Sequence, residues 1–118
     1  MGITSAVCNS FKQEILEAEH NFTASTGNTF NLALYDSGAD LSKSTTAYTT
    51  SEELATTGGY TAKGNALTSV TPVLSTDTAV CDFSNTSWTS ASFTARGCLI
   101  FNDSHSSDAS VCAIDFGG

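Results

Sequence analysis

Positive charge is scarce in this chain of 118 residues, which carries four Lys and Arg side chains against twelve Asp and Glu, a formal net charge of −8. The four cations, Lys12, Lys43, Lys63 and Arg96, are scattered and form no basic cluster. Binding to nucleic acid depends on several Lys and Arg side chains that neutralise phosphates, and an anionic membrane surface attracts basic segments for the same reason. The composition therefore argues against a nucleic-acid partner and against a membrane partner.

Long apolar runs are also missing, so the sequence predicts no transmembrane helix. The first residues form an amphipathic segment and not the continuous apolar run of a signal peptide. The sixth residue is Ala, so the N-terminal pattern for myristoylation is not met. These absences favour synthesis in a reducing cytoplasm.

Cysteine pairs with metal-ligand spacing are absent as well. Cys8, Cys81, Cys98 and Cys112 are far apart and form no Cys-x-x-Cys pair, which argues against a structural zinc site. A disulfide between Cys98 and Cys112 is one alternative, because these residues fall on adjacent predicted strands. All four lie in apolar-periodic runs, and we interpret them as small buried hydrophobes.

Two apolar runs near the C-terminus predict a β-hairpin that forms the core. In the run from Ser92 to Asn102, alternate residues fall on opposite faces, and between Cys98 and Phe101 both faces are apolar. A polar loop separates this run from the return run that begins at Ser110. We therefore expect this strand to be covered on both sides, with another sheet, a helix or a neighbouring subunit as the second cover. Each large apolar side chain that is buried there should contribute about 1.5–3 kcal/mol to stability. The candidate core residues of this hairpin are Phe93, Leu99, Phe101 and Ile114.

The N-terminal segment predicts one amphipathic helix over about residues 5–21, because apolar residues recur there at three- and four-residue steps. Thr4 or Ser5 is the expected N-cap, and the helix is expected to cover the buried strands. Phe11 and Ile15 are its candidate core residues. His20, near the expected helix end, is interpreted as a solvated residue with no second His nearby.

Further strands are expected between residues 29 and 117. Phe30–Tyr35 alternates and contributes the candidate core residues Leu32 and Leu34. Short strands are also predicted in 60–67, in 67–75, where Pro72 limits pairing to an edge or a bulge, and in 78–83; Ser51–Leu54 is a candidate helical turn. Ser and Thr, nearly a third of the chain, suit strands with hydroxylated outer faces. The sequence predicts a mainly β, single compact β-sandwich or barrel-like domain over 1–118 with one N-terminal amphipathic helix.

Several short segments match catalytic motifs but lack the sequence context that each motif requires. Asp115-Phe-Gly spells the kinase metal-binding triplet, but a kinase needs far more chain and a Gly-rich loop. Asp103, His105 and Asp108 crowd one polar loop with serines, yet a catalytic triad requires groups fixed by a scaffold. Asp36 and Asp40 lack the spacing of a calcium loop. We therefore predict a non-enzymatic protein with no catalytic, cofactor-binding or metal-ligating residues.

Three side chains stand out as candidates for an interface. Arg96 is the single Arg, in an otherwise apolar strand, and an ion pair with Asp82 or Asp115 is its expected role. Trp88 lies in a predicted loop and is expected to anchor against the core. Tyr48 lies in a Ser/Thr-rich connector. The candidate interface residues are Tyr48, Trp88 and Arg96.

Several short segments, in this order along the chain, resemble the small virion structural proteins of tailed bacteriophages, the type found in aquatic and cyanobacterial phages. The segments are Phe11–Leu16, Phe30–Tyr35, Thr45–Thr50, Gly59–Gly64, Phe93–Gly97 and Asp115–Gly118. In related sequences the chain commonly continues past Phe-Gly-Gly into a further β segment. The resemblance implies a non-enzymatic, β-rich head decoration (cement) protein, assembled in the host cytoplasm onto the capsid surface.

The same resemblance implies that the major capsid protein is the partner. We also expect this chain to form a homo-oligomer. A homotrimer is favoured, because threefold positions on a capsid suit trimers. Two alternatives stay open. One is a tail or tail-fibre associated structural module. The other, from a different class, is a small carbohydrate-binding module or hydrolase, which would need a concave pocket that holds Asp82, His105 or Trp88.

Overall fold

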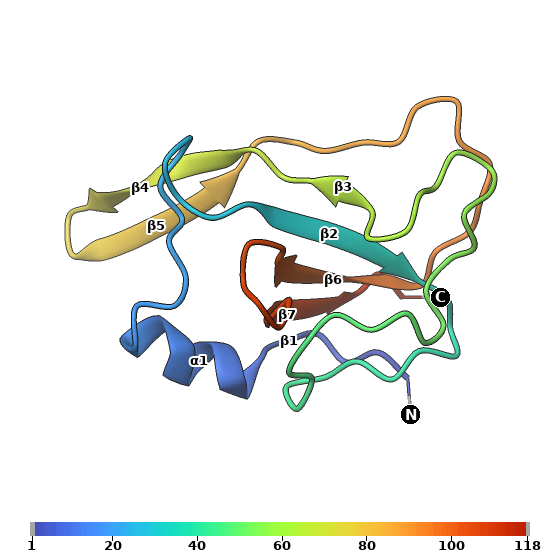
Figure 1. Ribbon diagram of the computed structural model, residues 1–118, viewed down its shortest axis with the longest axis horizontal. Helices are drawn as coiled ribbons and strands as arrows, with labels where there is room; N and C mark the ends of the chain where they lie inside the picture. The colour runs from blue at the N-terminus through green and yellow to red at the C-terminus, as the bar shows by residue number, and fades with distance from the viewer. Residues whose placement is uncertain (1, 118) are drawn as a thin grey trace.

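The computed structural model describes residues 2–117 and shows a mainly β protein with one open sheet, one separate hairpin and one short helix (Figure 1). The main sheet has five strands in the order β1-β7-β6-β2-β3, and all of its pairings are antiparallel. The elements are β1 (Ala6–Val7), α1 (Asn9–Leu16), β2 (Phe30–Tyr35), β3 (Asn65–Ala66), β4 (Ser69–Ser75), β5 (Thr78–Phe83), β6 (Gly97–Asn102) and β7 (Ser110–Asp115).

The expected C-terminal hairpin is confirmed as β6 and β7, with a register shift between Ile100 and Phe101. On its other side β6 pairs with β2 along its whole length, from Phe30 opposite Asn102 to Tyr35 opposite Gly97. The predicted beginning of the first strand near Ser92 is wrong, because β6 begins at Gly97 and residues 92–95 form no strand. The prediction failed there because the alternation of this segment serves loop packing and not strand pairing.

Both faces of the central strands are covered, as the apolar run from Cys98 to Phe101 predicts. On one face, Leu99 and Phe101 are fully buried with Tyr35 under the loop that carries Leu41 and Tyr48. On the opposite face, Leu34 and Cys98 pack against Tyr60 at one end of the sheet. At the other end, Phe30 and Val111 form a cluster with side chains from α1, from the chain after it and from β5. The core therefore lies on both sides of β2, β6 and β7.

The helix is shorter than predicted, since α1 spans Asn9–Leu16 and not 5–21. Ala6 and Val7 instead form β1, which pairs with the outer edge of β7. An unpaired edge strand exposes backbone donors and acceptors, and pairing with β7 satisfies them better than another helical turn would. The predicted caps are also wrong. The N-cap is Cys8, without a side-chain cap bond, and the Ser5 hydroxyl accepts a hydrogen bond from the Asp115 amide at 2.7 Å.

Strands β4 and β5 fall where the sequence predicts, but they pair only with each other and form a two-stranded arm (Figure 1). The register shift between Val70 and Val73 spans Pro72, which confirms the expected bulge. In the figure the arm extends to the left, beyond the end of β2. We refer to residues 69–83 as the arm.

Gly64 fixes the turn that brings β3 beside β2. Its φ is +68°, and a Cβ atom at this position would lie 1.9 Å from the carbonyl oxygen of Leu32. Only glycine fits a left-handed backbone with so close an approach. The arm begins three residues after β3, so this turn also sets where the arm leaves the sheet.

The predicted core is right for Leu34, Leu99 and Phe101, which are buried, while Phe11 and Leu32 are partly buried against the core. It is wrong for Ile15, Phe93 and Ile114, which are 39%, 36% and 38% exposed. Each lies at the border of a covering element and not beneath it.

Three further expectations need correction, one about a helical turn, one about the cysteines and one about a closed barrel. The candidate helical turn Ser51–Leu54 is a turn that bridges β2 through Glu53 and Tyr35. The four cysteines are free thiols, but Cys81 is exposed on the arm, so the expectation that all four are buried is wrong for it. Strands within residues 2–117 form no closed barrel. Within the same range, no helix has the length and apolar character needed to cross a membrane.

Candidate functional site

An apolar groove lies between α1, the arm and the main sheet. It has a volume of about 400 Å³ and its walls are wholly apolar. The lining residues come from the helix and the chain after it, from the arm, and from β6 and β7: Phe11, Ile15, Phe22, Pro72, Cys81, Phe83, Ile100, Val111 and Cys112. We refer to this surface as the groove. No charged group points into it, so it suits an apolar occupant and offers no acid, base or nucleophile for catalysis other than thiols.

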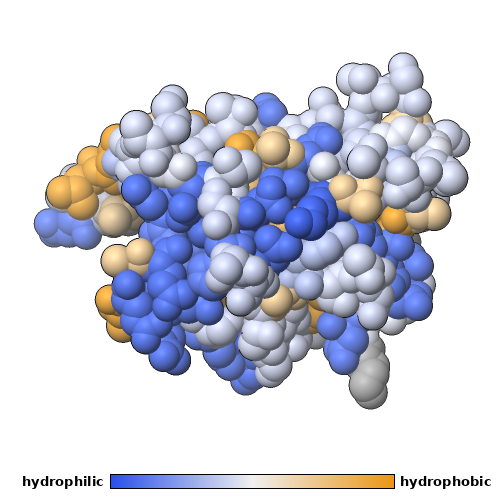
Figure 2. Space-filling view, viewed as in Figure 1, coloured by the Kyte–Doolittle hydropathy of each residue, from blue (hydrophilic) through white to orange (hydrophobic). Residues whose placement is uncertain are grey.

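The arm that forms one wall of the groove carries large apolar side chains on both faces. Val73 pairs with Val80 across the hairpin and Leu74 with Ala79, so large side chains stand on opposite faces of the ribbon. Val73 is 59% exposed and Leu74 is 75% exposed. Figure 2 shows this apolar surface on the projecting arm, with a hollow below it and further apolar surface beyond the hollow. A two-stranded hairpin is marginally stable by itself in water. The arm is attached to the core through Phe83, while Val73 and Leu74 farther along it stay exposed.

Arg96 forms the predicted ion pair with Asp115, at 2.8 Å between Nε and a carboxylate oxygen. Asp82, the other expected partner, lies on the arm. The pairing raises the pKa of Arg96 and lowers the pKa of Asp115. Both side chains are partly exposed, so the pair is a surface pair and contributes little to stability.

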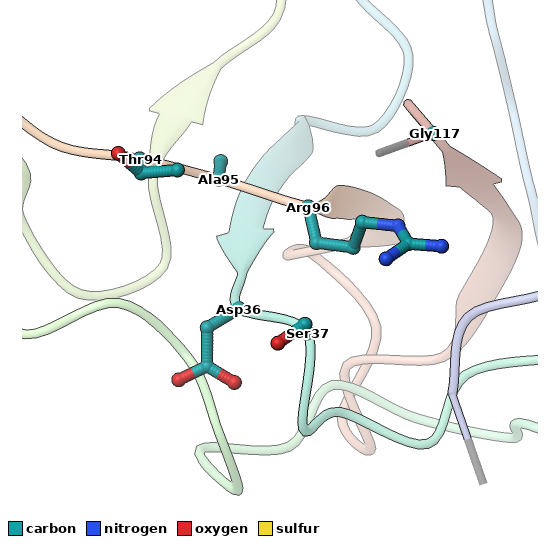
Figure 3. A pocket seen from close by; sticks show the side chains of 6 residues that line it. All are labelled: Asp36, Ser37, Thr94, Ala95, Arg96 and Gly117. Carbon is teal, nitrogen blue, oxygen red and sulfur yellow. The ribbon is translucent and has the colours of Figure 1, made fainter.

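Arg96 also borders an open pocket of about 320 Å³ (Figure 3). Its other walls come from the turn after β2, the segment before β6 and the end of β7: Asp36, Ser37, Thr94, Ala95 and Gly117. In Figure 3 the guanidinium points away from the Asp36 carboxylate, so the two charged groups do not converge on one point. The pocket therefore lacks the arrangement of paired groups that acid–base catalysis requires.

Tyr48 and Trp88, the other candidate interface residues, are half-buried in separate parts of the molecule. Tyr48 stacks on Phe101 at 4.7 Å and donates a 2.5 Å hydrogen bond to Glu53. Burial, and then the hydrogen bond to this carboxylate, raise the pKa of Tyr48. Trp88 packs against Tyr60 at 6.1 Å, which confirms its expected anchoring. Their contact with a partner stays a prediction.

Two histidines and two glutamates join the end of α1 to the loop after β6. His20 lies 2.9 Å from Glu14, His105 lies 2.8 Å from Glu19, and the two rings stack at 6.0 Å. The expectation that His20 is solvated without a second His nearby is therefore wrong, since its side chain is fully buried. The prediction failed because His20 and His105 are far apart in the sequence.

This cluster has metal-ligand residue types, since ligand atoms of Glu14, Glu19 and His105 lie within 4.8 Å of one another. Its hydrogen bonds do not suit a metal, however. The amide of Ser107 donates to Nδ1 of His105, so the neutral ring carries its proton on Nε2 and donates it to Glu19. The hydrogen bond from His105 lowers the pKa of Glu19. The Nε2 lone pair that a metal would need is thus not available, and the cluster serves as a tie between α1 and the loop.

Residues proposed for a carbohydrate-binding or hydrolase site are not brought together. Asp82 lies on the arm, His105 pairs with Glu19, and Trp88 packs on Tyr60. Across residues 2–117, no hydrogen bond or ring contact joins any two of the three.

Sequence reasoning did not identify the groove as a site, although it identified Phe11 and Ile15 as apolar positions. The available signal was the arm, whose two strands place large apolar residues on both faces. No family model, curated protein or solved structure is significantly similar to this chain.

Proposed function

We propose that this chain is a non-enzymatic structural protein of a phage virion, which decorates and stabilises the capsid surface by binding the major capsid protein. The observation that carries the proposal is the exposed arm beside the groove. An exposed apolar surface on a protein marks an interaction site, and the arm exposes Val73 and Leu74 beside a groove with apolar walls. The resemblance of several sequence segments, in their order along the chain, to small phage virion proteins is the reason for choosing this assembly.

The remaining surface is compatible with a decoration role. The net charge of −8 keeps such a protein soluble before it assembles. Arg96 and the partly exposed Trp88 offer the residue types that dominate protein interfaces. In this proposal the second layer of the expected β-sandwich is completed by assembly, because the arm and the groove face need a cover that the chain itself does not give.

The test is binding of the purified chain to expanded phage heads that lack decoration. We expect saturable binding with many copies per head and none on isolated tails. Arg96→Ala should weaken this binding, whereas Lys43→Ala, which removes an exposed cation beside the start of α1, should leave it unchanged. Exclusive labelling of tails, with few copies per particle, would replace the proposal with the tail or tail-fibre alternative. Absence of binding to either would refute a virion role.

A further inference from the structure

We infer that the free edge of β5 in the arm is a docking site for an extended segment of the partner protein, which adds to the arm as a third strand. The inference rests on the proposed function, which supplies the partner, and deepens it by naming the contact. It also names the chemistry of the segment: apolar residues at alternate positions, with lysine or arginine between them.

The first step is the direction of the backbone groups of β5. Within residues 2–117, β5 pairs only with β4. The amide of Ser84, directly after β5, donates to the carbonyl of Thr68, directly before β4. In an antiparallel pair, successive residues alternate between facing the neighbouring strand and facing away from it. The backbone groups of Phe83, Cys81 and Ala79 therefore face the free edge.

Two observations support this assignment. The Phe83 amide donates to the carboxylate of Asp82 at 2.7 Å and not to β4. The bulge places its extra residue in β4, so the alternation along β5 is unbroken. Ala79 and Cys81, both exposed, therefore present two amides and two carbonyls along the edge. This is the row of groups to which an added strand bonds.

The second step is the difference between the two edges of the arm. Proteins block exposed strand edges with proline, with lysine or with a bulge. The β4 edge has Pro72 and the bulge, and the hydroxyl of Thr71 accepts the amide of Ala24, from the segment after α1, at 3.0 Å. Strand β5 contains no proline, no Lys or Arg and no bulge. Its edge is therefore the one open to an added strand.

The third step is the face that an added strand shares with the groove. Cys81 and Phe83 line the groove, so the side chain of Ala79 lies on the same face of β5. Figure 1 draws β5 on the side of the arm toward α1, and Figure 2 shows a hollow below the arm. A strand added to β5 continues its pleat, so every second side chain faces the groove. The apolar walls of the groove require these side chains to be apolar.

The fourth step is charge complementarity. The arm carries Asp77 and Asp82 and no Lys or Arg, and neither acid forms an ion pair within residues 2–117. Asp82 lies on the face of β5 opposite the groove, where a lysine or arginine of an added strand can pair with it. Across the groove, α1 and the chain after it carry one cation and three acids: Lys12, Glu14, Glu17 and Glu19. A second copy does not fit, because none of the strands β1–β7 contains Lys or Arg.

The first test compares two substitutions of Ala79 in binding to expanded heads that lack decoration. Ala79→Pro removes the amide on the free edge, where proline is tolerated because β4 does not use that amide. Ala79→Val adds a side chain of similar size and keeps the amide. We expect the proline variant to bind about tenfold more weakly and the valine variant to bind as the unaltered chain does. Asp82→Lys, which leaves the backbone of the edge intact, should weaken binding up to about fivefold.

The second test needs no phage component. Its probe is a synthetic peptide of seven residues that alternates valine and lysine, and the control peptide alternates valine and glutamate. Nuclear magnetic resonance follows amide hydrogen exchange in the isotope-labelled chain. We expect the lysine peptide to slow exchange at Ala79 and Cys81. Leu74, which pairs with Ala79 and faces the opposite edge of the arm, should be unaffected. The glutamate peptide should protect none of these amides.

The two tests separate the inference from the proposed function. Protection of Ala79 and Cys81 by the lysine peptide, without binding to heads or tails, would support the docking edge and refute the virion role. Head binding that Ala79→Pro and Asp82→Lys leave unchanged would overturn the docking edge and support the proposed function. The inference is also wrong if the lysine peptide protects Leu74 instead, if it protects no amide, or if the glutamate peptide protects the edge equally well.

Discussion

Replacing Asn102 by Ala should destabilise the protein more than its position near a loop suggests. The Asn102 side chain is completely buried and makes three hydrogen bonds. Its Nδ2 donates to His20 Nδ1 at 3.0 Å and to Asn28 Oδ1 at 3.1 Å, and its Oδ1 accepts the amide of Ser104 at 3.0 Å. One side chain thus links the end of β6 to the segment after α1.

The cost follows from those three bonds. Each contributes about 0.5–1.5 kcal/mol, and a buried group that loses its partner costs about 1–3 kcal/mol. The ring of His20 is fully buried and would keep its bond to Glu14 but lose the donor at Nδ1. We therefore expect a loss of about 3 kcal/mol, which is a large fraction of the roughly 5–15 kcal/mol that stabilises a domain.

Urea unfolding followed by tryptophan fluorescence measures this loss, since Trp88 is the single Trp. With a slope of about 2 kcal/mol per molar urea, the midpoint should fall by about 1.5 M. The matched control is Asn85→Ala, an exposed position, where a change within about 0.5 kcal/mol is expected. In combination with His20→Ala the two costs should not add, because both remove the same bond. If Asn102→Ala behaved like the control, the buried network would be refuted as a source of stability.

Two further predictions concern the turn before β3 and the buried thiols. Gly64→Ala should destabilise the protein by about 1 kcal/mol or more, because the positive φ of Gly64 and a nearby carbonyl oxygen of β2 exclude a Cβ atom. Thermal unfolding measures this loss, and an unchanged midpoint temperature would contradict the prediction. Burial raises the pKa of Cys98 to about 12 and that of Cys112 to about 11, from an ordinary value of 9.0. Between about pH 9 and pH 11 the unfolded chain has lost these protons while the folded chain retains them, so the free energy of unfolding should fall as pH rises. A thiol reagent at pH 8 should label exposed Cys81 first and the buried Cys8 and Cys98 only after unfolding, and equal rates for these three thiols would contradict the burial.

Local patterns predicted the strands well, because alternation and turn residues act over a few positions. The bounds of Phe30–Tyr35 and Thr78–Phe83 follow from the sequence alone. The length of α1 could not be predicted from the sequence, because Ala6 and Val7 pair with the edge of β7 and form a strand. The burial of His20 did not follow either, because its partner Asn102 is 82 residues away in the sequence. What the sequence leaves open is long-range pairing.

The arm shows why the candidate site was harder to predict than the fold. A strand with apolar residues on both faces needs cover on both faces, but its sequence does not say whether the cover belongs to the same molecule. Here β4 begins three residues after β3, which pairs with the outer edge of β2, and it continues past the end of that strand (Figure 1). The arm therefore extends beyond the part of the main sheet that could cover it. Val73 and Leu74 have the composition of core residues and the exposure of surface residues, and the partner that the proposed function requires would reconcile the two by covering them.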